Sequence, residues 1–220
     1  MTIEVVLFDI DGTLVDSNEQ HVNAWVFAFR EAGHPQELDD IRAQIGKGGD
    51  LLVPELLPDV DDAVRKGISE RQGDYFKDMY LDNVGPFEGA AALIKRVHAS
   101  GRKVVLASSA KRDELDHYVG LMGIEACLAA TTSIDDVETS KPEPDLFALA
   151  IGKVGVEPSN ALVVGDTIYD VDAALRAGIA TVGVTSGPFD ESQLKEAGAI
   201  AVFADVASIL RDFDQSPLAR

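Results

Sequence analysis

The sequence contains little of what would mark a secreted or membrane protein. Cys127 is the only cysteine, so no disulfide can form within the chain, and a reducing cytoplasm is the expected location. No apolar run approaches the roughly 18 residues that a membrane-spanning helix needs. The opening stretch, MTIEVVLFDIDGT, lacks a basic leader followed by an apolar segment and a cleavage site. We therefore expect no signal peptide.

Basic residues are also scarce. The chain has 19 lysines and arginines against 38 aspartates and glutamates, which gives a formal net charge of -19. Nucleic acids and anionic membranes bind to basic surfaces, so neither is an expected partner. Any small anionic ligand would need local positive charge, either from a metal ion or from a few lysines.

What the sequence does have is an alternation of short apolar runs and helical patterns. Its 220 residues, of which 46% are hydrophobic, are enough for a substantial core. Short Val/Ile-rich runs are typical of strands that are buried on both faces of a parallel sheet. These runs are Ile3–Phe8, Lys103–Ala107, Ala161–Gly165, Ala180–Thr185 and Ala199–Phe203, with Cys127–Thr131 as a weaker sixth. Helical patterns lie between them at Gly89–Ser100, Arg112–Met122, Asp145–Val154, Tyr169–Ala177 and Glu191–Ala197. The predicted fold class is α/β, with a doubly wound, Rossmann-like parallel sheet as its core.

One long segment between the first strand and Pro86 has no strand signal. Val22, Trp25, Val26 and Phe29 form an apolar helical stripe, which follows a Ser17/Gln20 capping-box pattern. Gly33 marks the expected end of this helix. Further helical stretches occupy Asp39–Ile45, Asp50–Leu57 and Asp61–Met79. We predict a small all-helical domain at residues 16–83, inserted into an α/β core domain of residues 1–15 and 84–220. The two crossings between them would lie near Val15–Ser17 and Asn83–Pro86.

Polar side chains follow several of the predicted strands. In open parallel sheets, ligands bind beyond the carboxyl ends of the strands. The residues that reach this edge are Asp9 and Asp11 after the first strand, Ser108 and Ser109 after the second, Asp166 and Asp170 after ALVVG, and Lys141 from the SKPEP segment. The sequence therefore gathers carboxylates, hydroxyls and an ammonium at one place.

The carboxylates in this set predict a metal site. Asp9 and Asp11 share a face if the backbone between them is extended, and nearby carboxylates repel each other unless a cation or a proton relieves them. Asp166 adds a third. Oxygen ligands of this kind suit magnesium, and no His/Cys cluster points to zinc. Each aspartate alone would more simply be a helix cap or turn residue, but their convergence favours a common site.

The same residues resemble a known family. DIDGT at Asp9–Thr13, Ser108 after a strand, Lys141 in KPEPD and GDTIYD at Gly165–Asp170 are similar, in order, to the four motifs of the haloacid dehalogenase superfamily. The resemblance covers nearly the whole chain. It implies a parallel sheet with a mobile cap, and the insert resembles the helical cap of the phosphoglycolate phosphatase and β-phosphoglucomutase-like branch.

The resemblance also implies an activity and roles. The chain would be a magnesium-dependent phosphatase of small phosphorylated metabolites, in which Asp9 attacks phosphorus and Asp11 acts as general acid and then base. Asp9, the Asp11 carbonyl and Asp166 would hold Mg²⁺. Ser108 and Lys141 would bind the transferring phosphoryl group, and Asp170 and Thr13 would support the site. The second aspartate, Asp11, distinguishes this pattern from the dehalogenases of the superfamily.

Signals in the insert are weaker. His21 and Trp25 resemble an H-x-x-x-W pattern of β-phosphoglucomutase-like members. An ordinary helix histidine explains His21 equally well, and core packing is the favoured interpretation of Trp25. Gly46 and Lys47 resemble a glycine-rich cap loop that could contact substrate through backbone N–H groups; a plain turn is the alternative. Ser109 is a further candidate substrate contact.

Two other functions remain open from the sequence. One is a sugar-phosphate mutase of the β-phosphoglucomutase type, which would need an arginine where this chain has Gly49. The other is a catalytically silent binding protein on the same fold. The expected partner is a small-molecule phosphate monoester, and no oligomeric state is predicted.

Overall fold

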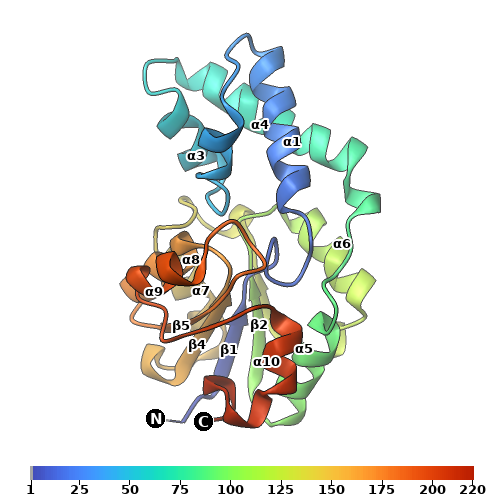
Figure 1. Ribbon diagram of the computed structural model, residues 1–220, viewed down its shortest axis with the longest axis vertical. Helices are drawn as coiled ribbons and strands as arrows, with labels where there is room; N and C mark the ends of the chain where they lie inside the picture. The colour runs from blue at the N-terminus through green and yellow to red at the C-terminus, as the bar shows by residue number, and fades with distance from the viewer. Residues whose placement is uncertain (1) are drawn as a thin grey trace.

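The fold is a six-stranded parallel sheet with helices on both faces (Figure 1). A computed structural model describes residues 2–220. The strand order is β3-β2-β1-β4-β5-β6. The strands span β1 Val5–Phe8, β2 Lys103–Ala107, β3 Leu128–Thr132, β4 Ala161–Gly165, β5 Ala180–Val184 and β6 Ala201–Phe203. The predicted fold class is confirmed, and the weak sixth signal is the edge strand β3.

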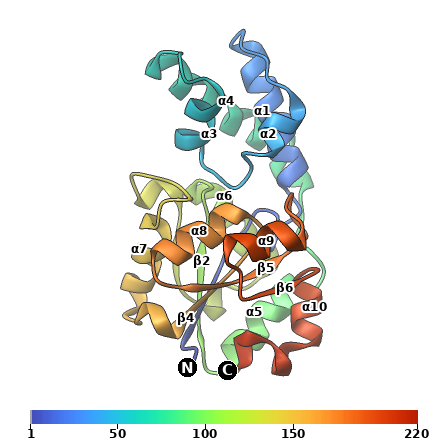
Figure 2. The ribbon, with the colours of Figure 1, turned by 60° about the vertical axis from the view of Figure 1, so that its left-hand side comes forward.

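The central strand β1 is apolar on both sides because both faces of the sheet are covered. Val6 and Phe8 belong to one hydrophobic cluster, while Val5 and Leu7 belong to another. The first cluster is closed by α5 (Ala90–Ala99), α6 (Arg112–Met122) and α10 (Val206–Arg211), and the second by α7 (Asp145–Val154) and α8 (Ile168–Arg176). Helix α9 (Glu191–Ala197) packs beside α8 at the edge of the sheet (Figure 2). Burial on both faces explains why the strands read as continuous apolar runs.

The insert is helical, as expected, and lies above the carboxyl ends of the strands (Figure 1). Its helices are α1 (Asn18–Glu31), α2 (Leu38–Arg42), α3 (Gly49–Leu56) and α4 (Asp62–Met79). They enclose their own hydrophobic cluster, which includes Phe29, Leu52 and Ile68. Having its own core fits the predicted separate domain, whose boundaries remain a prediction.

The two crossings between insert and sheet run side by side. Val15 forms an antiparallel bridge with Pro86, and the Asp16 N–H donates to the Gly85 carbonyl over 3.0 Å. The predicted Ser17/Gln20 capping box is wrong. Ser17 does precede α1, but its side chain makes no capping hydrogen bond and donates instead to Asp11.

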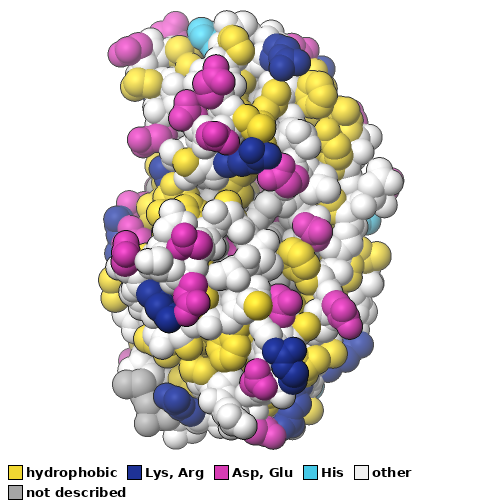
Figure 3. All heavy atoms as spheres, viewed as in Figure 1, with side chains coloured by type: hydrophobic (Ala, Val, Ile, Leu, Met, Phe, Trp, Pro, Cys, Tyr) yellow, Lys and Arg dark blue, Asp and Glu magenta, His cyan; other side chains and the backbone are white. Residues whose placement is uncertain are grey.

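On the face shown in Figure 3, the acidic side chains do not gather in one patch. They are spread over both the helical insert and the sheet domain. Among residues 2–220, no helix is long and apolar enough to cross a membrane.

Candidate functional site

Strand register brings the predicted residues to one edge. Phe8 is paired with Leu106 on β2 and with Val164 on β4. The chain therefore leaves the three central strands at nearly the same level, and Asp9, Ser108 and Asp166 follow there. All three side chains are buried.

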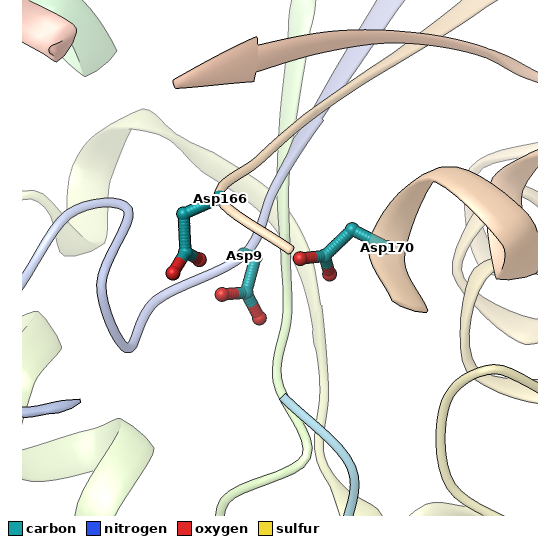
Figure 4. A group of neighbouring side chains, drawn as sticks. All are labelled: Asp9, Asp166 and Asp170. Atoms are coloured by element: carbon teal, nitrogen blue, oxygen red, sulfur yellow. The ribbon is translucent and has the colours of Figure 1, made fainter. Parts of the chain in front are cut away.

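Three carboxylates meet at this edge (Figure 4). Oxygens of Asp9, Asp166 and Asp170 all lie within 4.8 Å of one another. Asp170 comes from the first turn of α8. Its Oδ2 accepts from the Thr167 hydroxyl over 2.6 Å and from the Thr167 N–H over 3.0 Å. This reciprocal cap orients Asp170 toward Asp9.

Among residues 2–220, Lys141 supplies the one ammonium in contact with this group. Its Nζ donates to Asp9 Oδ1 and, over 2.7 Å, to Asp170 Oδ1. Burial alone would lower the pKa of Lys141, but the charges of Asp170 and Asp9 raise it, so the side chain is held as a cation. A buried ammonium with two charged partners is anchored in place rather than free to sample solvent.

One ammonium does not balance three carboxylates. Burial, and then the charges of Asp170 and Asp11, raise the pKa of Asp9 to about 7, although Lys141 opposes the shift. Burial and the charges of Asp9 and Asp170 likewise raise the pKa of Asp166. The raised carboxyl pKa values come first from burial and then from the mutual repulsion of the carboxylates. Such a donor set fits a hard divalent cation, which would relieve the repulsion.

Asp166 is held by close neighbours from three segments. The Thr13 hydroxyl donates to Asp166 Oδ1 over 2.8 Å, and the Asn18 amide donates to Oδ2 over 3.1 Å. Two glycines leave room for the carboxylate, since a Cβ atom would lie 2.1 Å from Asp166 Oδ2 at Gly12 and 1.9 Å from it at Gly187. Thr13 therefore lies where a supporting residue was expected.

Asp11 points away from the three carboxylates and toward the insert. Its Oδ1 accepts from the Ser17 hydroxyl over 2.6 Å and lies 3.2 Å from His21 Nε2. Burial would raise the pKa of Asp11, but the charge of His21 and its hydrogen bond lower it. The pKa of His21 is raised in turn by Asp11 against the effect of burial. The two form an ion pair at the border between sheet and insert.

His21 is itself held in place by the insert. Its ring stacks on Phe76 with centroids 3.8 Å apart, and Nδ1 lies 3.2 Å from the Gln72 amide. Ser108 approaches Asp11 from the other side, with its hydroxyl 3.4 Å from Oδ2. His21 is thus a positioned partner of Asp11. Trp25 is buried against Phe29, with ring centroids 5.7 Å apart, and it also lines the cavity described below.

A cavity of about 260 Å³ lies between the sheet edge and the insert. The carboxylates of the site border it through Asp9 and Asp11, and the insert contributes the loop from Gly46 to Asp50. Ser109 also lines it and donates to the Gly46 carbonyl over 3.4 Å. Lys47 lines the cavity too, but its ammonium donates to Gln44 over 2.6 Å and lies 4.9 Å from the centre of the Tyr169 ring. The weaker candidates of the insert therefore do lie around one cavity, and their contact with substrate remains a prediction.

Several residues of the site carried no usable signal in the sequence. Asn18 and Gly187 contact Asp166 from helix α1 and from the loop after β5. Glu114 and Gln72 line the cavity from α6 and α4. Asp50 and Ser140 meet across the cavity's edge, where the Ser140 N–H donates to Asp50 Oδ2 over 2.9 Å. Ser140 and Asp50 do lie next to quoted motifs, since Ser140 precedes Lys141 and Asp50 follows Gly49, but nothing in the sequence shows that they meet.

The sequence matches the haloacid dehalogenase-like hydrolase family over residues 3–178. Protein SUPPRESSOR OF QUENCHING 1, chloroplastic, of Arabidopsis thaliana is 31% identical over 94% of this chain, which spans 20% of that protein. Pyrophosphatase PpaX of Halalkalibacterium halodurans is 27% identical over 84% of each chain. The crystal structure of a hydrolase from Pseudomonas syringae superposes with a TM-score of 0.90 at 30% identity, covering 98% of this chain and 99% of that one.

Proposed function

The chain belongs to the haloacid dehalogenase-like hydrolase family, and from this premise we propose that it is a magnesium-dependent phosphatase of small phosphorylated metabolites. The observation that carries the proposal is the buried group of Asp9, Asp166 and Asp170, in which the Lys141 ammonium binds Asp9 and Asp170. This group borders, through Asp9, a cavity large enough for a small molecule. Its similarity to a protein named as a pyrophosphatase supports phosphoryl transfer to water.

The proposed reaction has two steps. In the first, an Asp9 oxygen attacks phosphorus, the bond from phosphorus to the leaving oxygen breaks, and the proton shared between His21 and Asp11 passes through Asp11 to that oxygen. In the second, Asp11 takes a proton from water, the water oxygen attacks phosphorus, and the bond to Asp9 breaks to release phosphate. The placement of Asp11 between the sheet edge and the cavity supports this division of roles.

Lys141 and Ser108 would stabilise the transferring phosphoryl group. Lys141 touches Asp9 already, so its charge lies beside the phosphorus that Asp9 would carry. Such fixed positive charge stabilises the oxygens on which negative charge develops. Asp9 and Asp166, with the Asp11 carbonyl, would hold the magnesium ion, which would neutralise charge on the phosphoryl oxygens when bound.

Hydrolysis is favoured over mutase chemistry by the insert loop. A mutase holds a second phosphate on its substrate, a task for which the planar fork of arginine is suited. Among residues 2–220, no arginine lines the cavity. Gly49 packs where a Cβ atom would lie 2.0 Å from Ser69 Oγ, and Asp50 beside it would repel a second phosphate.

The test is a product measurement. Purified protein is incubated with magnesium and either phenyl phosphate or β-glucose 1-phosphate, the latter with a bisphosphate primer, and free phosphate and glucose 6-phosphate are followed over time. We expect net phosphate release that stops when a chelator is added and resumes with excess magnesium. Isomerisation that outruns phosphate release would show a mutase, and full activity in chelator would refute the metal assignment.

A further inference from the structure

Glu114 is a buried carboxylate that the proposed reaction does not use. It lies in the first turn of α6, is 4% exposed, and lines the cavity with Asp11 and His21. No hydrogen bond or ion pair to its carboxylate is made by any of residues 2–220. Its burial raises the pKa of Glu114 to about 7. A carboxylate this deep in a protein is costly unless something pairs with it.

Three cations lie near Glu114: Lys111 lines the same cavity but makes no hydrogen bond or ion pair to Glu114, and the other two are paired elsewhere. His21 pairs with Asp11 over 3.2 Å, and Lys77 pairs with Asp113 over 2.5 Å. Gln72, another polar residue that lines the cavity, turns its amide to His21 over 3.2 Å. The protein therefore leaves the acceptor capacity of Glu114 for whatever occupies the cavity.

Glu114 is also on the correct side of the site to meet the leaving group. Its neighbours in the cavity wall, Asp11 and His21, stand where the leaving oxygen would receive its proton, away from the phosphoryl pocket of Asp9 and Lys141. We infer that Glu114 is a specificity-determining residue that accepts a hydrogen bond from a hydroxyl group of the leaving part of the substrate. This inference rests on the proposed phosphatase function and narrows its substrate class to phosphates of polyols or sugars.

The charges of Glu114, Asp11 and His21 in the cavity wall select against other leaving groups. A leaving group with its own carboxylate or second phosphate would lie against Glu114 and Asp11, so phosphoglycolate-like substrates and pyrophosphate are disfavoured. An ammonium would lie beside His21, which lies 3.2 Å from Asp11, and would compete with it for that carboxylate. A neutral hydroxyl satisfies the buried acceptor without bringing a like charge to either group.

The experiment compares two substrates that differ at one carbon. Glycerol 3-phosphate ends in a CH₂OH group and 3-phosphoglycerate ends in a carboxylate, so the ratio of their kcat/KM values isolates the effect of charge. We expect the wild-type protein to prefer glycerol 3-phosphate by at least tenfold. Glu114→Gln keeps the size of the side chain and removes its charge, and it should reduce this ratio by about tenfold, or about 1.4 kcal/mol. Phenyl phosphate, which has no hydroxyl, should be hydrolysed at nearly the wild-type rate.

Glu125→Gln is the matched control, because Glu125 is exposed and outside the cavity; its ratio should equal that of the wild type. A preference of the wild type for 3-phosphoglycerate or for phosphoethanolamine, or an unchanged ratio in Glu114→Gln, overturns the inference. An equal loss on all substrates, phenyl phosphate included, would show a merely structural role and also overturn it.

Failure of the proposed function gives a different result, namely no hydrolysis of any substrate. Calorimetric titration of the magnesium-loaded protein with glycerol 3-phosphate and with 3-phosphoglycerate then decides the inference by itself. Selective binding of glycerol 3-phosphate that is reduced in Glu114→Gln supports it, and equal binding of the two ligands contradicts it.

Discussion

At the scale of single residues, the site depends on backbone that comes very close to Asp166. Gly12 has a φ of +77°, and a Cβ atom there would lie 2.1 Å from both Asp166 Oδ2 and Asn18 Nδ2. Gly33 has nearly the same φ, +79°, but no atom lies within 4 Å of its Cβ position. Comparing an alanine substitution at Gly12 with one at Gly33 therefore separates the effect of backbone strain from that of the steric conflict at the site.

We expect Gly12→Ala to lower the free energy of unfolding well beyond Gly33→Ala. Gly33→Ala should cost about 1 kcal/mol, from backbone strain alone. Gly12→Ala adds the displacement of Asp166 and Asn18, for a further cost of about 1–3 kcal/mol, and it should weaken magnesium binding. Urea unfolding and calorimetric magnesium titration of both variants measure this, and equal behaviour of the two would contradict the geometry around Asp166.

A second prediction at this scale concerns the pH dependence of stability that Glu114 causes, and its test needs no substrate. The pKa of Glu114 is raised from 4.5 to about 7 by burial, so between these values the folded protein keeps a proton that the unfolded chain releases. Stability therefore falls as the pH rises through this window. Glu114→Gln cannot titrate and should escape the loss.

The free energy of unfolding of Glu114→Gln, relative to wild type, should increase by about 2 kcal/mol from pH 5 to pH 8 in metal-free buffer. Urea unfolding at the two pH values tests this directly, with exposed Glu125→Gln as the control that shows no such change. A pH-independent difference between Glu114→Gln and wild type would show that the carboxylate is not desolvated.

At the scale of elements, the insert is fastened to the sheet domain beside Lys141. The Gly48 N–H donates to the Ser140 hydroxyl over 2.9 Å, and the Ser140 N–H donates to Asp50 Oδ2 over 2.9 Å. These bonds close the cavity at the residue that precedes Lys141. We expect the crossings near Val15–Ser17 and Asn83–Pro86 to act as the hinges of the insert, and these two bonds would hold its closed arrangement.

Asp50→Ala should raise KM by about tenfold and change kcat less. It removes a hydrogen bond to a charged acceptor, which contributes about 1.5 kcal/mol or more to the closed state, and substrate binding must then supply that energy. Asp40→Ala removes an exposed carboxylate of the same insert that makes no ion pair or hydrogen bond within residues 2–220. Steady-state kinetics compare the two, and identical KM values would show that the contact does not stabilise closure.

Much of the element structure was predictable, because it is local. Buried strands such as β4 were found from their apolar runs, and α6 and α7 from their periodicity, with the predicted bounds. Helix α10 was missed because it is short, at 6 residues, and carries too little periodicity to stand out. Its start is marked only by the reciprocal bonds between Asp205 and Ser208.

The site was predictable only where motif residues follow strands. Asp9, Ser108 and Asp166 were placed together because parallel strands end at one edge of a sheet. The meeting of Asp50 with Ser140, and of Asn18 with Asp166, joins segments far apart in the chain, so no local pattern records it. Asp170 was expected as a support for Lys141, and the bond between them is present; in addition, its carboxylate joins the possible metal donors.

At the scale of the whole molecule, the net charge of -19 opposes the approach of any phosphate. The site offsets this repulsion locally with the buried Lys141 ammonium and with a set of three carboxylates that suits a divalent cation. Fixed positive charge in a water-poor pocket acts more strongly than the same charge in solvent. The central claim is that these groups serve one covalent step, in which Asp9 takes the phosphoryl group.

The most direct measurement of that claim is rapid-quench labelling with a ³²P-phosphorylated substrate and magnesium, on the wild type and on Asp9→Asn. Asn is nearly the size of Asp but cannot act as the nucleophile. We predict protein-bound label in the wild type, mapped to Asp9, and no label in the variant, whose turnover should fall by at least about 10³-fold, or roughly 4 kcal/mol of barrier. An Asp9→Asn protein that keeps more than about a tenth of the wild-type rate, or that still carries the label, would contradict the account.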